Sequence, residues 1–194
     1  MATFRAVTGT LDALRERLLL SLADDLAGLV ENPDVRVLGS QDLRTDPAGH
    51  ALGLYLHRLA VDPYGRNRYL PPGRPDQRPR PELPVNLHLL LVGWSTNATA
   101  EALLVGWAMQ QLGASLELDV SHLAVADSGW GESETLQVIP EDMSTEDLMR
   151  VWDSLPGDYR LSAPYLVKTL RLEPARTVQP GPPVRSIVMP VEEP

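Results

Sequence analysis

The chain of 194 residues lacks cysteine altogether and has a single lysine and a single phenylalanine. Without cysteine it has no disulfide, no thiolate-bound zinc, no iron–sulfur cluster and no cysteine nucleophile. No apolar run approaches the ~20 residues that a membrane-spanning helix needs. The first ten residues also lack the basic start and apolar core of a secretory signal. We therefore expect neither thiol chemistry nor a membrane span.

The rest of the composition is that of a folded globular protein, with 43% hydrophobic and 22% charged residues. At this length we expect one domain over residues 1–173, followed by an extended Pro-rich tail over residues 174–194. The net charge of −9 argues against nucleic-acid binding by the surface as a whole. Every basic residue except Lys168 is arginine, whose planar guanidinium suits interfaces because it pairs with a carboxylate at two points.

Three segments predict helices, over residues 10–31, from Thr96 or Asn97 to Leu112, and over residues 145–155. In the first, leucines recur at steps of three and four, and Thr10 is placed as N-cap. Gly113 ends the second helix. In the third, Ser144 and Asp147 resemble a capping box.

Six segments predict strands, over residues 35–38, 51–61, 85–94, 116–120, 135–139 and 163–172. Residues 85–94 are dense in Leu and Val, which predicts a central strand buried on both faces. The link between strands 51–61 and 85–94 is Pro-rich rather than helical, which disfavours a uniformly parallel sheet. We predict a mixed α/β (α+β) fold, a single domain whose mostly antiparallel sheet is packed by three helices.

Residues 62–84 carry seven prolines and five arginines, which excludes a helix and predicts a long, basic, extended loop. Residues 119–153 carry the opposite charge, with nine acidic residues and one basic residue, Arg150. If these segments meet within one molecule they form a local network, and if they meet between copies they suit a head-to-tail ring. The interface residues predicted for the ring are Arg66, Arg68, Tyr69, Arg74, Arg78, Arg80, Glu141, Asp142 and Asp147.

The candidates for metal binding are His50, His57, His88 and His122. His57 and His88 are expected to face each other on neighbouring strands, but no third ligand accompanies them at tight spacing, so we expect no zinc site.

Ser95 follows Gly93 and Trp94 at a strand-to-helix turn, as in a nucleophile elbow. Position 97 is Asn where that motif needs Gly, so a helix-capping role is favoured.

The residue pattern leaves two alternative functions open. Glu132 and Glu134 are candidates for the acid and base of a hydrolase, although acidic pairs are usually solvated surface. Trp94 and Trp107 are candidates for lining a small-molecule pocket.

Four stretches, in order, resemble a known family. They are the Leu-rich first helix, the strand at residues 52–59 leading into the Arg/Pro-rich loop, the strand and turn at residues 85–95, and the helix at residues 145–155 followed by residues 159–165. This order and spacing resemble the cap, or tail-terminator, proteins of phage-tail-like contractile injection systems.

The resemblance implies a structural cap without catalysis, cofactor or metal. Such caps form a homohexameric ring on the last ring of inner tube and sheath, end polymerisation and fix particle length. The implied partners are other copies of the chain, sheath subunits and inner-tube subunits, with no nucleic acid and no membrane. The implied location is the cytoplasm during assembly and then a released particle.

Overall fold

The computed structural model describes residues 2–64, 83–119, 123, 130 and 135–172. The helices are α1 (Ala6–Asp25), α2 (Ala98–Ala114) and α4 (Thr145–Asp153), with a 3-10 turn, η1, at Asp42–Arg44. The strands are β1 (Pro33–Leu38), β2 (His50–Val61), β3 (Leu83–Trp94), β4 (Glu117–Leu118), β5 (Leu136–Pro140) and β6 (Ser162–Leu172). Most of the predicted Arg/Pro-rich loop and the predicted C-terminal tail lie outside the described residues.

The strands form one sheet in the order β1-β2-β3-β6-β5-β4. β1 pairs with β2 in parallel, and every other described strand pair is antiparallel. The predicted mixed α+β fold, with a mostly antiparallel sheet and three helices, is therefore confirmed. No helix in the described part of the chain has the length and apolar character to cross a membrane.

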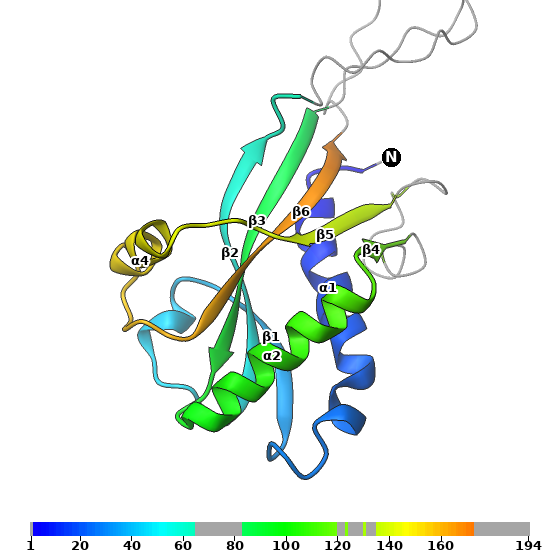
Figure 1. Cartoon of the computed structure of the whole chain (residues 1–194). Helices are drawn as coiled ribbons and strands as arrows, with labels where there is room; N and C mark the ends of the chain where they lie inside the picture. The colour runs from blue at the N-terminus through cyan, green and yellow to red at the C-terminus, as the bar shows by residue number, and fades with distance from the viewer. Residues whose placement is uncertain (1, 65–82, 120–122, 124–129, 131–134, 173–194) are drawn as a thin grey trace, which may run out of the picture.

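β3 lies inside the sheet, between β2 and β6, and its side chains are buried on both faces. Leu87, Leu89 and Leu91 point into the larger core, which α1 and α2 cover. Leu90 and Val92 point into a second core on the opposite face. Figure 1 shows α1 and α2 together on one side of the sheet and α4 on the other. The prediction that this strand is buried on both faces is confirmed.

The second core is small and depends on α4. Trp152 of α4 and Leu43 of η1 are buried there with Trp94 from the end of β3. The Trp152 indole Nε1 donates to Ser162 Oγ on β6 at 3.0 Å. The apolar face of α4 thus holds this short helix on the sheet.

The start of the first helix differs from the prediction. α1 begins at Ala6, and the predicted cap, Thr10, is buried within the helix, where its hydroxyl donates to the Ala6 carbonyl at 2.8 Å. A threonine hydroxyl can donate a hydrogen bond to the carbonyl four residues earlier, so threonine is compatible with a helix interior. The buried stripe extends toward the N-terminus through Ala6 and Gly9, which the leucine spacing does not reveal.

The other two predicted caps are confirmed. The Asn97 side chain accepts hydrogen bonds from the backbone N–H groups of Thr99 and Ala100 at the start of α2. The Ser144 hydroxyl accepts from the Asp147 N–H at 3.1 Å at the start of α4.

Candidate subunit interface

The predicted interface residues fall into two groups. Arg66, Arg68, Tyr69, Arg74, Arg78 and Arg80 lie outside the described residues, as do the hydrolase candidates Glu132 and Glu134. Glu141 and Asp142 lie in the connector between β5 and α4, and Asp147 lies in the first turn of α4. In Figure 1 this connector runs from β5 across the sheet to α4.

Glu141 faces inward rather than toward solvent. Its Oε1 atom lies 2.7 Å from Nδ1 of His88, and the two side chains are 18% and 11% exposed. Its backbone N–H donates to the Pro164 carbonyl of β6 at 3.0 Å. The connector is therefore held to both β3 and β6 before α4 begins.

His57 joins this buried polar cluster. Its ring lies edge-to-face with the ring of His88, with centroids 6.0 Å apart, which confirms the expectation that the two histidines face each other. Burial lowers the pKa of His57 below its ordinary value, and the Glu141 carboxylate partly opposes that shift. His57 Nε2 and Glu141 Oε2 are buried, and neither has a hydrogen-bond partner in the part of the chain that the structure describes. No group of three or more His, Asp or Glu side chains among the described residues is placed to hold a metal ion.

The outer face of α4 is acidic. Glu146, Asp147 and Asp153 of the helix are exposed, as is Asp142 in the connector just before it, and these four residues together are called the acidic outer face of α4. Arg150 pairs with Glu146 and Asp147 within the helix, so the remaining charge on this face is negative. Of the predicted acidic interface residues, Asp142 and Asp147 are thus exposed for contact with another molecule, whereas the Glu141 carboxylate is engaged with His88.

Ser95 lies in the turn before α2 and is not placed for nucleophilic attack. Its side chain is fully buried, and its hydroxyl accepts from the Asn97 N–H at 2.9 Å. Nδ1 of His50 lies 2.7 Å from the same hydroxyl. A fully buried hydroxyl cannot meet a substrate. The favoured helix-capping role of Ser95 is wrong, because the N-cap of α2 is Asn97 and Ser95 binds the N–H of that cap residue instead.

The alternative of a pocket lined by both Trp94 and Trp107 is not met in the described structure, because the two indoles lie on opposite faces of the sheet. Trp94 lies under the guanidinium of Arg160, whose carbon is 4.7 Å from the ring centroid. Trp107 lies on α2, in the larger core. The sheet between the two indoles makes that alternative wrong.

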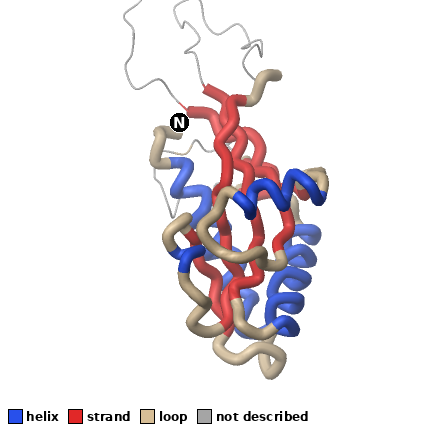
Figure 2. The backbone as a smooth tube through the Cα atoms, turned by 90° about the vertical axis from the view of Figure 1, so that its left-hand side faces the viewer, coloured by secondary structure: helices blue, strands red, loops and turns tan. Residues whose placement is uncertain are grey.

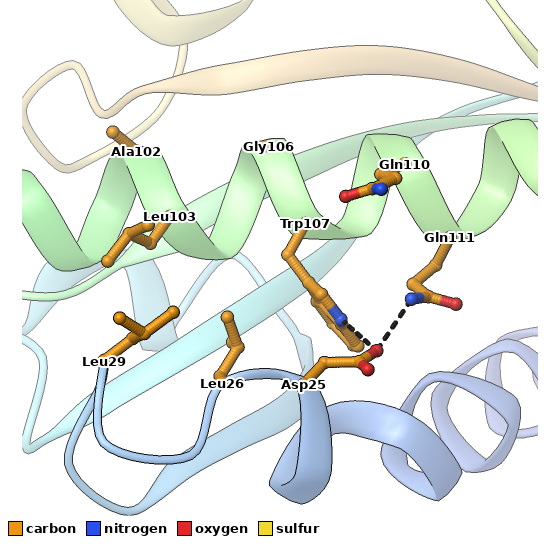
Figure 3. Close-up of a pocket in the computed structure, with 9 residues that line it drawn as sticks. All are labelled: Asp25, Leu26, Leu29, Ala102, Leu103, Gly106, Trp107, Gln110 and Gln111. Carbon is orange, nitrogen blue, oxygen red and sulfur yellow. Dashed lines mark hydrogen bonds between the residues drawn. The ribbon is translucent and has the colours of Figure 1, made fainter.

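Trp107 instead lines an open groove between α2 and the end of α1, with a volume of about 400 Å³. Figure 3 shows Trp107 and Gln111 reaching down from α2 to Asp25. The indole Nε1 and the Gln111 Nε2 both donate to Asp25 Oδ2, at 2.9 and 2.7 Å. These bonds fasten the two helices together. Because the residues come from segments far apart in the chain, no local sequence signal indicates the groove.

Comparisons with known proteins agree with this architecture. The family model described as the Pvc16 N-terminal domain matches residues 9–186. No curated protein matches the chain.

Two solved structures are similar in fold. One is the sheath/tube terminator of an extracellular contractile injection system, PVC, in its extended state, with a TM-score of 0.59 and 17% identity, covering 100% of this chain and 64% of that one. The other is the tube-terminating cap of the anti-feeding prophage, with a TM-score of 0.52 and 15% identity, covering 90% of this chain and 60% of that one. The chain thus spans less than two thirds of the length of either.

The resemblance to tail terminators of contractile injection systems is confirmed by the family model and by both structures. Since the family model covers nearly the whole chain, this protein belongs to the Pvc16 N-terminal domain family.

Proposed function

We propose that this chain is a non-enzymatic cap of a contractile injection system. It forms a hexameric ring on the last ring of inner tube and sheath, ends their polymerisation and so fixes particle length. The observation that carries the proposal is the family match over residues 9–186, supported by a fold shared with two terminators of such particles.

The chemistry of the described residues supports a structural role. Of the groups best suited to catalysis, Ser95 and His88 are buried, and His57 and Glu141 are only partly exposed. The Glu141–His88 pair joins the connector to β3. A catalytic group needs to reach its substrate within hydrogen-bond distance, and the low exposure of these side chains disfavours such contact.

The proposed partners are other copies of the chain, sheath subunits and inner-tube subunits. Assembly takes place in the cytoplasm, and the cap then leaves as part of the released particle. Within the ring, the segment with Arg66, Arg68, Arg74, Arg78 and Arg80 of one copy contacts the acidic outer face of α4 on the next. Exposed ion pairs contribute only about 0–1 kcal/mol each, so apolar area must accompany them. Tyr64, 91% exposed at the start of this segment, and Tyr69 supply it.

Deleting the gene and imaging the particles tests the proposal. We expect tails of irregular length without a cap density, and restoration of a uniform length when the wild-type gene is returned. Returning the E132Q/E134Q variant is the matched control, because a hydrolase would need those carboxylates and a cap does not. Uniform tails with normal ends in the deletion strain would refute the proposed function.

The loop assignment has its own test. Replacing Arg66, Arg68, Arg74, Arg78 and Arg80 with Ser should weaken ring assembly and reduce its dependence on salt, because surface charge pairs are screened by ions. The melting temperature of the monomer should change little. Size-exclusion chromatography with light scattering at low and high salt measures the effect. Rings that form equally well in both proteins would remove the loop from the interface.

A further inference from the structure

Among the described residues, the sheet face that carries α4 is covered over only part of its length. Figure 2 looks onto this face: α4 crosses it at about mid-height, the neighbouring loops lie at and below that level, and the strands above α4 have no described helix over them. This uncovered part contains the last residues of β2 and β6 and the first residues of β3, since β3 runs antiparallel to both.

Strand register identifies the side chains on this uncovered part. Arg58 of β2 pairs directly with His88, and paired side chains share a face, so Arg58 lies on the α4 side of the sheet. Leu166 of β6 also pairs with His88, and Lys168 lies two residues further along the same strand. Arg171 pairs with Pro84, which lies four residues from His88 on β3 and therefore on the same face.

These three cations form a positive surface in a protein of net charge −9. Arg58 and Arg171 are exposed and Lys168 is half-buried. None of the three has an acidic partner among the described residues. Asp62, which follows β2, accepts hydrogen bonds from the Tyr64 N–H at 3.0 Å and from the Thr169 hydroxyl at 3.4 Å and forms no ion pair with any of the three cations in the described structure. An uncovered sheet face with surplus positive charge fits an acidic partner.

The acidic outer face of α4 has the matching charge and size. It carries the exposed Asp142, Glu146, Asp147 and Asp153, and its one cation, Arg150, is already paired. A nine-residue helix is about 14 Å long, and the six residues of β2 beyond its pairing with β1 extend about 20 Å, so the helix fits along the strands. The two surfaces are different patches of one molecule, so a contact between them is head-to-tail, the kind that closes into a ring.

We propose that the cationic sheet face of Arg58, Lys168 and Arg171 docks the acidic outer face of α4 from a second copy. This inference rests on the proposed ring and adds a surface of the folded domain to the interface. It extends the contact of α4 from the Arg/Pro-rich segment onto the adjoining end of the sheet.

Charge reversal on either surface tests the contact. The R58E/R171E variant makes both surfaces acidic, and the D142K/D153K variant makes both basic. Asp142 and Asp153 are chosen because neither takes part in a hydrogen bond or ion pair among the described residues, whereas Asp147 belongs to the helix cap. Each variant alone should need about tenfold or more higher concentration to form rings, as expected for a penalty of about 1.4 kcal/mol. The matched control is D12K/D24K, which reverses two exposed acids on α1, on the other face of the sheet.

Mixing the two variants gives the decisive measurement. In an alternating ring every reversed sheet face meets a reversed α4, and every native sheet face meets a native α4. We therefore expect the equimolar mixture to form rings at close to the wild-type concentration, by light scattering and negative-stain microscopy at low salt. Mixtures that assemble no better than the separate variants would overturn the proposal, as would variants that assemble like the control.

Folding is monitored so that a loss of rings is interpretable. Each variant should retain the wild-type circular dichroism spectrum and melting temperature, and the milder R58S/R171S variant replaces R58E/R171E if that protein fails to fold. The neutral variant should weaken assembly by a smaller factor, and unchanged assembly would count against the contact. If the wild type forms rings and the charge-reversal variants assemble equally well, this interface alone is refuted. Uniform tails in the deletion strain would instead refute the proposed function.

Discussion

His88 Nδ1 lies 2.7 Å from Glu141 Oε1, which joins the central strand to the connector that leads into α4. His88 lies two residues before Leu90 of the second core, on the same face of β3, so the pair fixes where the connector crosses the sheet beside that core. The direction of α4, and with it the position of the acidic face proposed to meet a neighbour, therefore depends on one buried polar contact as well as on apolar packing.

Removing the donor from this pair should destabilise the fold. The H88F variant keeps an aromatic ring but leaves the Glu141 carboxylate buried without its partner. We expect the free energy of unfolding to fall by about 1–3 kcal/mol, the usual cost of an unsatisfied buried group. Urea denaturation measures it. The control is E146Q, which breaks a pair whose side chains are 73% and 70% exposed and should change stability by less than about 0.5 kcal/mol. Equal losses in the two variants would contradict the prediction.

Lowering the pH should destabilise the protein partly through His57. Burial is the main cause of its lowered pKa, with Glu141 raising it and His88 and Arg58 lowering it further. Below the ordinary pKa of 6.5, the unfolded chain binds a proton at His57 that the folded chain accepts only at lower pH. The contribution of neutral His57 to the free energy of unfolding is therefore fully present above its ordinary pKa and is lost as the pH falls through the lower pKa of the folded state.

The H57F variant isolates this contribution because it keeps the ring contact with His88 and removes the titrating group. Urea unfolding at several pH values between about 7.5 and 5 should show a shallower loss of stability in the variant than in the wild type. Parallel curves for the two proteins would show that His57 does not contribute.

Gly157 should not tolerate a side chain. A Cβ atom at this position would overlap the backbone carbonyl oxygen of Leu43. Because that oxygen cannot move freely, G157A should destabilise the fold by about 1–3 kcal/mol. G113A is the matched control, since a Cβ there meets nothing within 4 Å on the exposed side of α2 and alanine favours a helix by about 1 kcal/mol over glycine. Thermal melting should move in opposite directions for the two variants, and a shared direction would be unexpected on these grounds.

Trp152 should be the main anchor of α4. It is 3% exposed, donates to Ser162 and lies edge-to-face with Tyr159 at a centroid distance of 5.9 Å. W152A should cost about 3–5 kcal/mol of stability, as for other large residues truncated in a core. Leu20, which is 79% exposed on α1, is the control, and L20A should have little effect. A small loss for W152A in chemical denaturation would show that other contacts hold the helix.

Features that depend on neighbours in sequence were predictable. The cap residues Asn97 and Ser144 mark helix starts because a side-chain oxygen reaches the free N–H groups two or three residues away. The unbroken apolar run of β3 predicted its central place, since only a strand covered on both faces buries consecutive side chains. The alternation of apolar residues in β6 likewise predicted a strand. Thr10 was misplaced because an internal threonine and a capping threonine look the same in sequence.

The sequence by itself determined the helices, the central strand, the family resemblance and the segregation of charge, because each is set by residue type and short-range spacing. Only the tertiary structure decided which charges face outward. Glu141 and Asp142 are adjacent in sequence, yet one pairs with His88 beneath the connector and the other is exposed. Trp94 at the end of β3 and Trp107 in the following helix, α2, lie on opposite sides of the sheet. Burial depends on which distant segments pack over a residue, and that is settled by the crossing of whole strands and helices.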